Sequence, residues 1–266
     1  MSNASSKSTE TAVPQSKPSG ASQPAWGPVS AVVISLLVFV VGFFVAGFVM
    51  YALAAVAGKT TQQTNDWLSS VTGQFVFVVL AEALVVGTVM IFLRQRKTSL
   101  RAVGYHRGPR FRDVGFALLG FVVYFVALIA ATAIAQHAFH INVDQKQELG
   151  FDNVFTTGEK CMAFISLVIL PPLAEETLFR GFLFTGLRKR LTFVWATIIV
   201  SLAFASLHLL ESSQGILWIA GIDTFVLSMV LCYLREKTGN LWAGILVHGL
   251  KNTLAFTFLY LVGGSS

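Results

Sequence analysis

Charged side chains are scarce in this sequence. Of its 266 residues only 12% are Asp, Glu, Lys or Arg, whereas 55% are hydrophobic and the mean hydropathy is +0.70. A soluble globule needs more polar side chains than this to cover its surface. The composition therefore excludes an ordinary soluble domain and indicates an all-α, polytopic membrane protein.

Several other features are missing. The chain has no His-Glu-x-x-His helix, no Gly-x-Ser-Gly loop and no Gly-x-Gly-Asp motif, which are signatures of other membrane or zinc proteases. It has no internal repeat and no second, soluble domain. The formal charge of +6 comes from basic residues that cluster between apolar runs instead of forming one stripe. We therefore expect no nucleic-acid partner.

Cysteine is rare, with Cys161 and Cys232 as the two examples. The helix order predicted below places them near opposite faces of the membrane, so we expect no disulfide between them. Both are interpreted as small, buried, apolar residues.

The N-terminal segment differs from the rest of the chain. Residues 1–25 are rich in Ser, Thr, Gln, Pro and Ala, a composition that buries too little apolar surface to fold, so we expect a disordered cytoplasmic tail. The first apolar run begins near Pro28 and continues for about 30 residues, much longer than the apolar core of a signal peptide. That run predicts a membrane anchor that is not cleaved.

Long apolar runs predict a bundle of about seven transmembrane helices. They are expected at 28–57, 68–93, 114–136, 161–187, 193–210, 216–234 and 241–262. With the N-terminus inside, 14 basic residues lie in cytoplasmic segments and three lie outside, namely Lys59, Lys146 and Lys160. Because cytoplasmic loops are enriched in Lys and Arg, we expect this orientation, in a multi-pass protein of the cell membrane.

We expect residues 26–156 to form an N-terminal group of transmembrane helices. Its cytoplasmic connector, 94–113, is basic. It could include a short interfacial helix that rests on anionic headgroups, although a plain topology signal is the simpler interpretation.

Three of the apolar segments in the C-terminal half carry polar side chains that should lie in lipid. An ionisable group in a bilayer costs several kcal/mol unless it is paired, so such groups are kept where function needs them. The residues are Glu175, Glu176 and Arg180, then Phe204 and His208, then His248 and Asn252.

The two glutamates follow Pro171 and Pro172. We expect the proline pair to break or kink the helix and to create a concave, water-accessible spot, with Glu175 near the start of a new helical stretch. Glu176 and Arg180 are four residues apart and share a helix face, so we assign them to a structural ion pair. Glu175 is then available for chemistry, with a histidine as its partner.

The depths of these groups agree only loosely. Counting ~1.5 Å per residue from the cytoplasmic helix ends places Glu175 about 18 Å deep, His208 about 22 Å and His248 about 10 Å. Asn252 lies one turn beyond His248 on the same face. The residues alone leave a transport path, a proton relay and a hydrolase open.

Three further charged residues are embedded in the predicted spans. Asp223 and Lys251 could form an ion pair across the last two helices, whereas Glu82 lies in the middle of the second span. We interpret all three as structural.

The ordered motifs resemble those of a known family. They are Glu-Glu-x-x-x-Arg at 175–180, Phe-x-x-x-His at 204–208 and His-x-x-x-Asn at 248–252. In this order, on successive apolar segments, they resemble the CPBP family of intramembrane proteases, which includes the CAAX prenyl endopeptidases and the ABI-type, bacteriocin-processing proteins. Phe-Arg-Gly at 179–181 and the proline before the glutamates are also similar. The resemblance covers about 160–256, so we interpret 157–262 as a CPBP-like catalytic domain.

The resemblance implies an endopeptidase that cleaves a peptide or protein substrate within the membrane. By similarity, Glu175 and His208 would activate a water, and His248 and Asn252 would stabilise the oxyanion. Around them Glu176, Arg180 and Phe204 would hold the catalytic groups in place.

The resemblance leaves the cofactor open. A zinc ion could be held by Glu175, His208 and His248. The alternative is a metal-free glutamate mechanism, which Asn252 favours because an amide is a poor zinc ligand.

Two other function classes compete with the protease. The first is a noncatalytic scaffold or regulator on the same fold, such as a bacteriocin-immunity protein or a secretion partner. The second is a small transporter, which the embedded charges favour but the absence of an inverted repeat disfavours.

Overall fold

The computed structural model describes residues 25–142, 145, 151, 154–209 and 215–262. Within these ranges the chain is helical and contains no strand. Nearly all of the predicted tail, residues 1–24, lies outside the described residues.

Six helical segments are long and apolar enough to cross a membrane. They are α1 (Pro28–Val56), α3 (Val71–Gln95), α4 (Phe111–Phe139), the continuous segment Thr157–Arg188, α9 (Trp218–Thr238) and Trp242–Val262. A shorter apolar helix, α8 (Phe193–His208), has 16 residues. All seven predicted helices are therefore present, and the prediction of a polytopic helix bundle is confirmed.

Two of these segments consist of several elements. Thr157–Arg188 contains α5 (Thr157–Phe164), the π-helix η2 (Ile165–Ile169), α6 (Leu170–Glu175), the π-helix η3 (Glu176–Phe184) and α7 (Thr185–Arg188). Trp242–Val262 contains α10 (Trp242–Phe256) and the π-helix η4 (Thr257–Val262). A short amphipathic helix, α2 (Thr61–Ser69), connects α1 to α3 and was not predicted.

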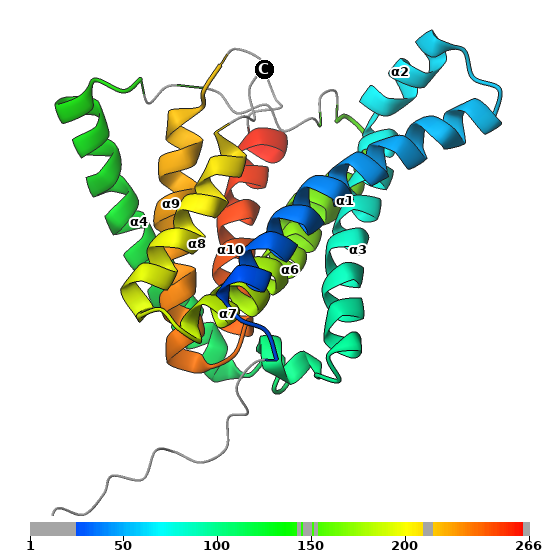
Figure 1. The fold of residues 1–266 in the computed structure, drawn as a ribbon. Coiled ribbons are helices and arrows are strands. Elements are labelled where there is room, and N and C mark those ends of the chain that lie inside the picture. The colour runs from blue at the N-terminus through cyan, green and yellow to red at the C-terminus, as the bar shows by residue number, and fades with distance from the viewer. Residues whose placement is uncertain (1–24, 143–144, 146–150, 152–153, 210–214, 263–266) are drawn as a thin grey trace, which may run out of the picture.

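The basic connections lie at one end of the bundle. Figure 1 places the α3–α4 connector, α7 and the turn between α9 and α10 together at the lower end, and α2 at the opposite end. This is the arrangement that the distribution of Lys and Arg predicts. The side of the membrane that this end faces stays a prediction.

The proline pair does not break its helix, so the predicted break is wrong, whereas the predicted kink stays a prediction. Ile169 and Leu170 keep helical dihedral angles, and the chain continues through Pro171 and Pro172 into α6. In the π-turn before the prolines, the Leu170 N–H bonds to the Ile165 carbonyl, five residues back. A wider turn of this kind absorbs the geometry that proline disturbs. Glu175 ends α6, and the stretch that follows is π-helical.

The centre of the bundle surrounds η3, whose nine residues are all buried. The Trp26 indole stacks on Phe182 with ring centroids 4.9 Å apart and donates to the Phe182 carbonyl at 3.0 Å. Gly186 makes a close approach to the start of α1, because a Cβ there would lie 2.5 Å from the Ala31 Cβ. These contacts hold α1 diagonally across the segment that carries the two glutamates (Figure 1).

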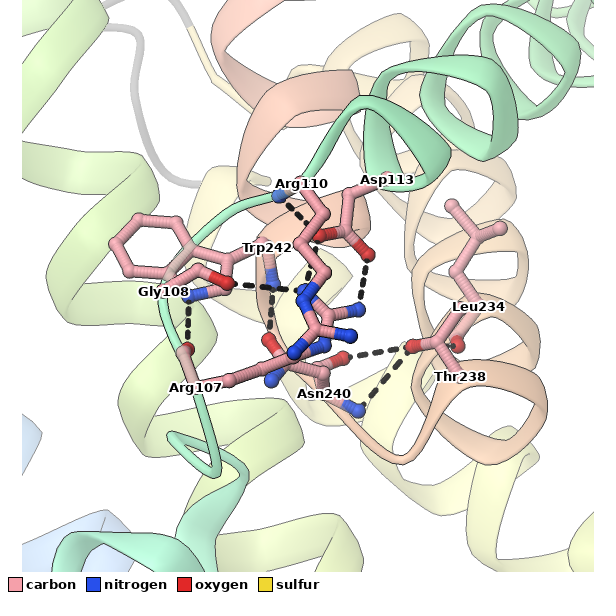
Figure 2. A network of polar contacts seen from close by, with 8 residues as sticks. All are labelled: Arg107, Gly108, Arg110, Asp113, Leu234, Thr238, Asn240 and Trp242. Atoms are coloured by element: carbon pink, nitrogen blue, oxygen red, sulfur yellow. Dashed lines mark hydrogen bonds and ion pairs between the residues drawn. The ribbon is translucent and has the colours of Figure 1, made fainter.

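The basic connector is fastened to the turn between α9 and α10 by the network in Figure 2. Arg107 donates to both carboxylate oxygens of Asp113 at 2.6 and 2.7 Å, and the Arg110 N–H donates to the same carboxylate at 2.8 Å. Trp242 donates its indole N–H to the Arg107 carbonyl at 2.7 Å, and its backbone N–H to Asn240 at 3.1 Å. The Asp113 carboxylate raises the pKa of Arg107, which stays charged.

The connector also includes the short helix that the sequence allowed for. It is the 3-10 helix η1 (Leu100–Val103), and Val103 is fully buried. A Cβ on Gly181 would lie 2.8 Å from the Val103 carbonyl oxygen, so η1 packs directly on η3. The connector therefore forms part of the protein core as well as a basic surface.

The two cysteines are both free thiols, as predicted. Cys232 is buried, whereas Cys161 is exposed, so its interpretation as a buried residue is wrong. Cys161 lies in α5, a helix in which only Ala163 is buried.

Candidate active site

The predicted ion pair is present at the start of η3. Arg180 Nη1 lies 2.8 Å from Glu176 Oε1, and the two side chains are 0% and 1% exposed. The guanidinium also lies 4.5 Å above the centre of the Phe204 ring, on α8. A buried cation and a buried carboxylate thus neutralise each other, and the aromatic face adds a cation–π contact.

His248 of α10 lies between the two glutamates. Its Nδ1 is 3.3 Å from Glu176 Oε1, and its Nε2 is 3.8 Å from Glu175 Oε2. Gly244, one turn earlier, permits this approach, because a Cβ there would lie 3.2 Å from Glu176 Oε2. A carboxylate only accepts hydrogen bonds, so Nδ1 carries a proton and Nε2 is directed towards Glu175.

His208 is oriented by its own helix. Its Nδ1 lies 2.9 Å from the carbonyl oxygen of Phe204. Because a carbonyl only accepts, the proton of this contact is assigned to Nδ1, and Nε2 is the acceptor nitrogen in that tautomer. The predicted partnership of His208 with Glu175 stays a prediction.

Phe204 connects the two imidazoles. Its ring centroid lies 4.8 Å from that of His208 and 6.0 Å from that of His248, edge-on in both cases. The side chain is fully buried.

His248 lies closer to the glutamates than the predicted depths of these residues in the membrane suggest. Those depths were counted along each helix from its cytoplasmic end, and such a count ignores where each helix begins and how far it tilts.

Asn252 donates its side-chain amide to the Leu167 carbonyl at 2.8 Å. That carbonyl would accept from residue 171 in an α-helix and from residue 172 in a π-helix, and both residues are prolines without an N–H. Asn252 therefore satisfies the acceptor that the proline pair leaves open. One amide hydrogen remains for other partners.

Glu175 is the carboxylate of the site with access to its surroundings. Its side chain is 17% exposed, compared with 1% for Glu176. The two neighbours therefore differ, with Glu176 enclosed in a structural pair and Glu175 partly exposed, although its Oε2, which faces His248, is a buried atom.

The connector contributes a residue that the sequence reasoning missed. The Tyr105 hydroxyl lies 2.8 Å from Thr177 Oγ1, and Thr177 donates to the Leu173 carbonyl at 2.6 Å, so Tyr105 is the donor to Thr177. Burial raises the pKa of Tyr105, and the charge of Glu176 raises it further, so the phenol stays neutral. The only sequence signal was an aromatic residue in a polar loop, which is too common to be specific.

The other embedded charges also have defined places. Lys251 Nζ lies 3.0 Å from Asp223 Oδ2, so the predicted pair between α9 and α10 is confirmed. The hydroxyl of Tyr124, on α4, donates to the same carboxylate. Glu82 is buried in α3 with 9% exposure.

The resemblance named Glu175, His208 and His248 as ligands for a zinc ion. Among the residues that the structure describes, no group of three or more His, Cys, Asp or Glu side chains is arranged to hold an ion. No chemical step below is assigned to a metal, and the choice between a zinc and a metal-free mechanism stays a prediction.

Comparison with known proteins identifies the same C-terminal segment that carries the glutamates and both histidines. Residues 157–254 match the family model described as type II CAAX prenyl endopeptidase Rce1-like, and this confirms the resemblance predicted from the three motifs. An uncharacterized 24.3 kDa protein of Escherichia coli is 31% identical over 99 residues, which are 36% of this chain and 44% of that protein. The chain therefore matches less than half the length of this relative. No solved structure matches the chain.

Proposed function

We propose, from the Rce1-like character of residues 157–254, that this multi-pass membrane protein is an intramembrane endopeptidase. The observation that carries the proposal is the position of His248, within 3.3 and 3.8 Å of two carboxylates, on a helix that should lie in lipid. Such a group of ionisable residues is costly in a bilayer and is expected only where chemistry requires it.

In the proposed reaction, Glu175 and His208 act on a water molecule. The Glu175 carboxylate and the imidazole of His208 are two bases, and one of them accepts a proton as the water oxygen attacks the scissile carbonyl carbon. The C–N bond then breaks, and the same proton passes to the leaving amine. Each of these steps conserves protons within the site and needs no external reductant or oxidant.

The developing oxyanion needs donors on the other side of the substrate. In this proposal a doubly protonated His248, with Glu176 beside its Nδ1, donates its Nε2–H to the oxyanion. The remaining amide hydrogen of Asn252 is the second proposed donor. Arg180 pairs with Glu176 at 2.8 Å and holds that carboxylate beside the imidazole.

The proposed substrate is a peptide or protein segment that reaches the site from the membrane or its surface. Prenylation of that substrate is not implied by any residue of the site. The experiment uses purified full-length protein in proteoliposomes with fluorogenic peptides, both lipidated and unmodified.

Glu175→Gln and His208→Ala should each abolish cleavage while leaving the melting temperature unchanged. The matched control is Glu236→Gln, which alters an exposed surface pair with Arg188. If Glu175→Gln cleaves as fast as the wild type, the hydrolytic role of this carboxylate is refuted. Survival of the cellular phenotype in Glu175→Gln would favour a scaffold or regulator instead.

A further inference from the structure

A charged network joins three helices at the level of the site. Lys251 of α10 pairs with Asp223 of α9 at 3.0 Å, and the two side chains are 19% and 20% exposed. Tyr124 of α4, 1% exposed, donates its hydroxyl to the second oxygen of Asp223.

Two consecutive residues of α10 make polar contacts with two different neighbouring segments. Lys251 is bound to Asp223 on α9, whereas Asn252 is bound to the Leu167 carbonyl in η2. Adjacent helical residues point about 100° apart, and the residue three to four positions earlier projects between them. That residue is His248, which meets Glu176.

The rotation of α10 about its axis decides whether His248 meets the glutamates. A side chain lies about 5 Å from the helix axis, so a rotation of about 10° moves it by about 1 Å. Between helices in lipid, apolar contacts are a weak determinant of rotation, because lipid tails are as apolar as leucine. Polar contacts on both sides of the helix are a much stronger determinant.

We propose that Asp223 and Tyr124 are positioning residues, which hold Lys251 so that α10 presents His248 to Glu176 and Glu175. Asn252 provides the opposing contact. The proposal rests on the proposed function of the site, because it assigns a catalytic purpose to the geometry of His248.

The test combines the double variant Asp223→Leu/Lys251→Met with a charge swap, Asp223→Lys/Lys251→Asp. Replacing both partners of a largely buried pair by apolar residues is often neutral or stabilising, so the apolar double variant should fold. Because the buried hydroxyl of Tyr124 loses its acceptor in that protein, the variant also carries Tyr124→Phe. A displacement of the catalytic imidazole by ~1 Å typically costs about 100-fold in rate, so its kcat should fall by about 10- to 100-fold while KM changes little. The charge swap should restore most of kcat.

The second readout is the ¹⁵N signal of His248 in histidine-labelled protein, which needs no catalysis. Its Nδ1 shift should move away from the hydrogen-bonded value in the apolar double variant and return in the charge swap. Wild-type kcat and an unchanged His248 signal in the apolar double variant would overturn the proposal. If the wild type lacked peptidase activity, the proposed function would fail while the His248 signal still tested the positioning.

Discussion

Removing the buried arginine of the site should destabilise the protein strongly. Arg180→Ala would leave the Glu176 carboxylate, 1% exposed, without its cation. Breaking a buried ion pair by removing one partner typically costs about 3–5 kcal/mol, because an uncompensated charge remains in a low-dielectric interior. The cation–π contact with Phe204 at 4.5 Å adds to the loss, up to about 2 kcal/mol.

One neighbour reduces this cost. His248 Nδ1 lies 3.3 Å from the same carboxylate oxygen, and a protonated imidazole could replace part of the missing charge. We therefore expect a net loss of about 3–5 kcal/mol instead of the full sum, which is at least a 100-fold change in the folding equilibrium at ~1.4 kcal/mol per factor of ten.

The assay is equilibrium unfolding in mixed micelles, followed by tryptophan fluorescence. The matched control is Arg188→Ala, since Arg188 also binds a carboxylate, that of Glu236, at 2.7 and 3.1 Å but with 31% and 39% exposure. An exposed pair of this kind contributes about 0–1 kcal/mol. Arg180→Met combined with Glu176→Gln should recover part of the stability, because no charge is then stranded. Equal stability of Arg180→Ala and Arg188→Ala would refute the reasoning.

Three further predictions concern the packing and chemistry of the site. Gly181→Ala should lower stability by about 1–3 kcal/mol in the same assay, because its Cβ would meet the Val103 carbonyl at 2.8 Å, whereas Gly115→Ala, with nothing within 4 Å, should be neutral or stabilising. Asn252→Leu should lower stability by about 1–3 kcal/mol because it leaves the Leu167 carbonyl unpaired, and a stable Asn252→Leu protein would argue for a purely catalytic role. Treatment with a strong chelator should leave peptidase activity unchanged in protein whose metal content is measured in parallel, and a loss that zinc restores would contradict the metal-free mechanism.

Much of the site could be predicted from the spacing of its residues. Glu176 and Arg180 are four positions apart on a helix, so their pairing needs no tertiary information. The same holds for the difference between Glu176 and Glu175, which point about 100° apart and therefore have different surroundings. The pairing of Asp223 with Lys251 could be predicted because few other partners exist in lipid.

Other contacts depended on how the helices are rotated and where they begin. Spacing along the chain does not reveal that His248 meets both glutamates, and the structure brings it to them through the small residue Gly244. The partner of Asn252 depended on the π-turns around the prolines, which keep the helix continuous and leave the Leu167 carbonyl open.

The amino-acid sequence by itself determined the membrane class, the positions of the helices and the chemical types of residue in the site, because lipid tolerates only long apolar helices and penalises every unpaired charge. The tertiary structure alone decided which groups His248 and Asn252 meet on the neighbouring helices. A helix places its side chains by rotation and register, and those two quantities follow from the contacts of Lys251, Asn252 and η3 with neighbouring helices, not from the order of residues along one chain.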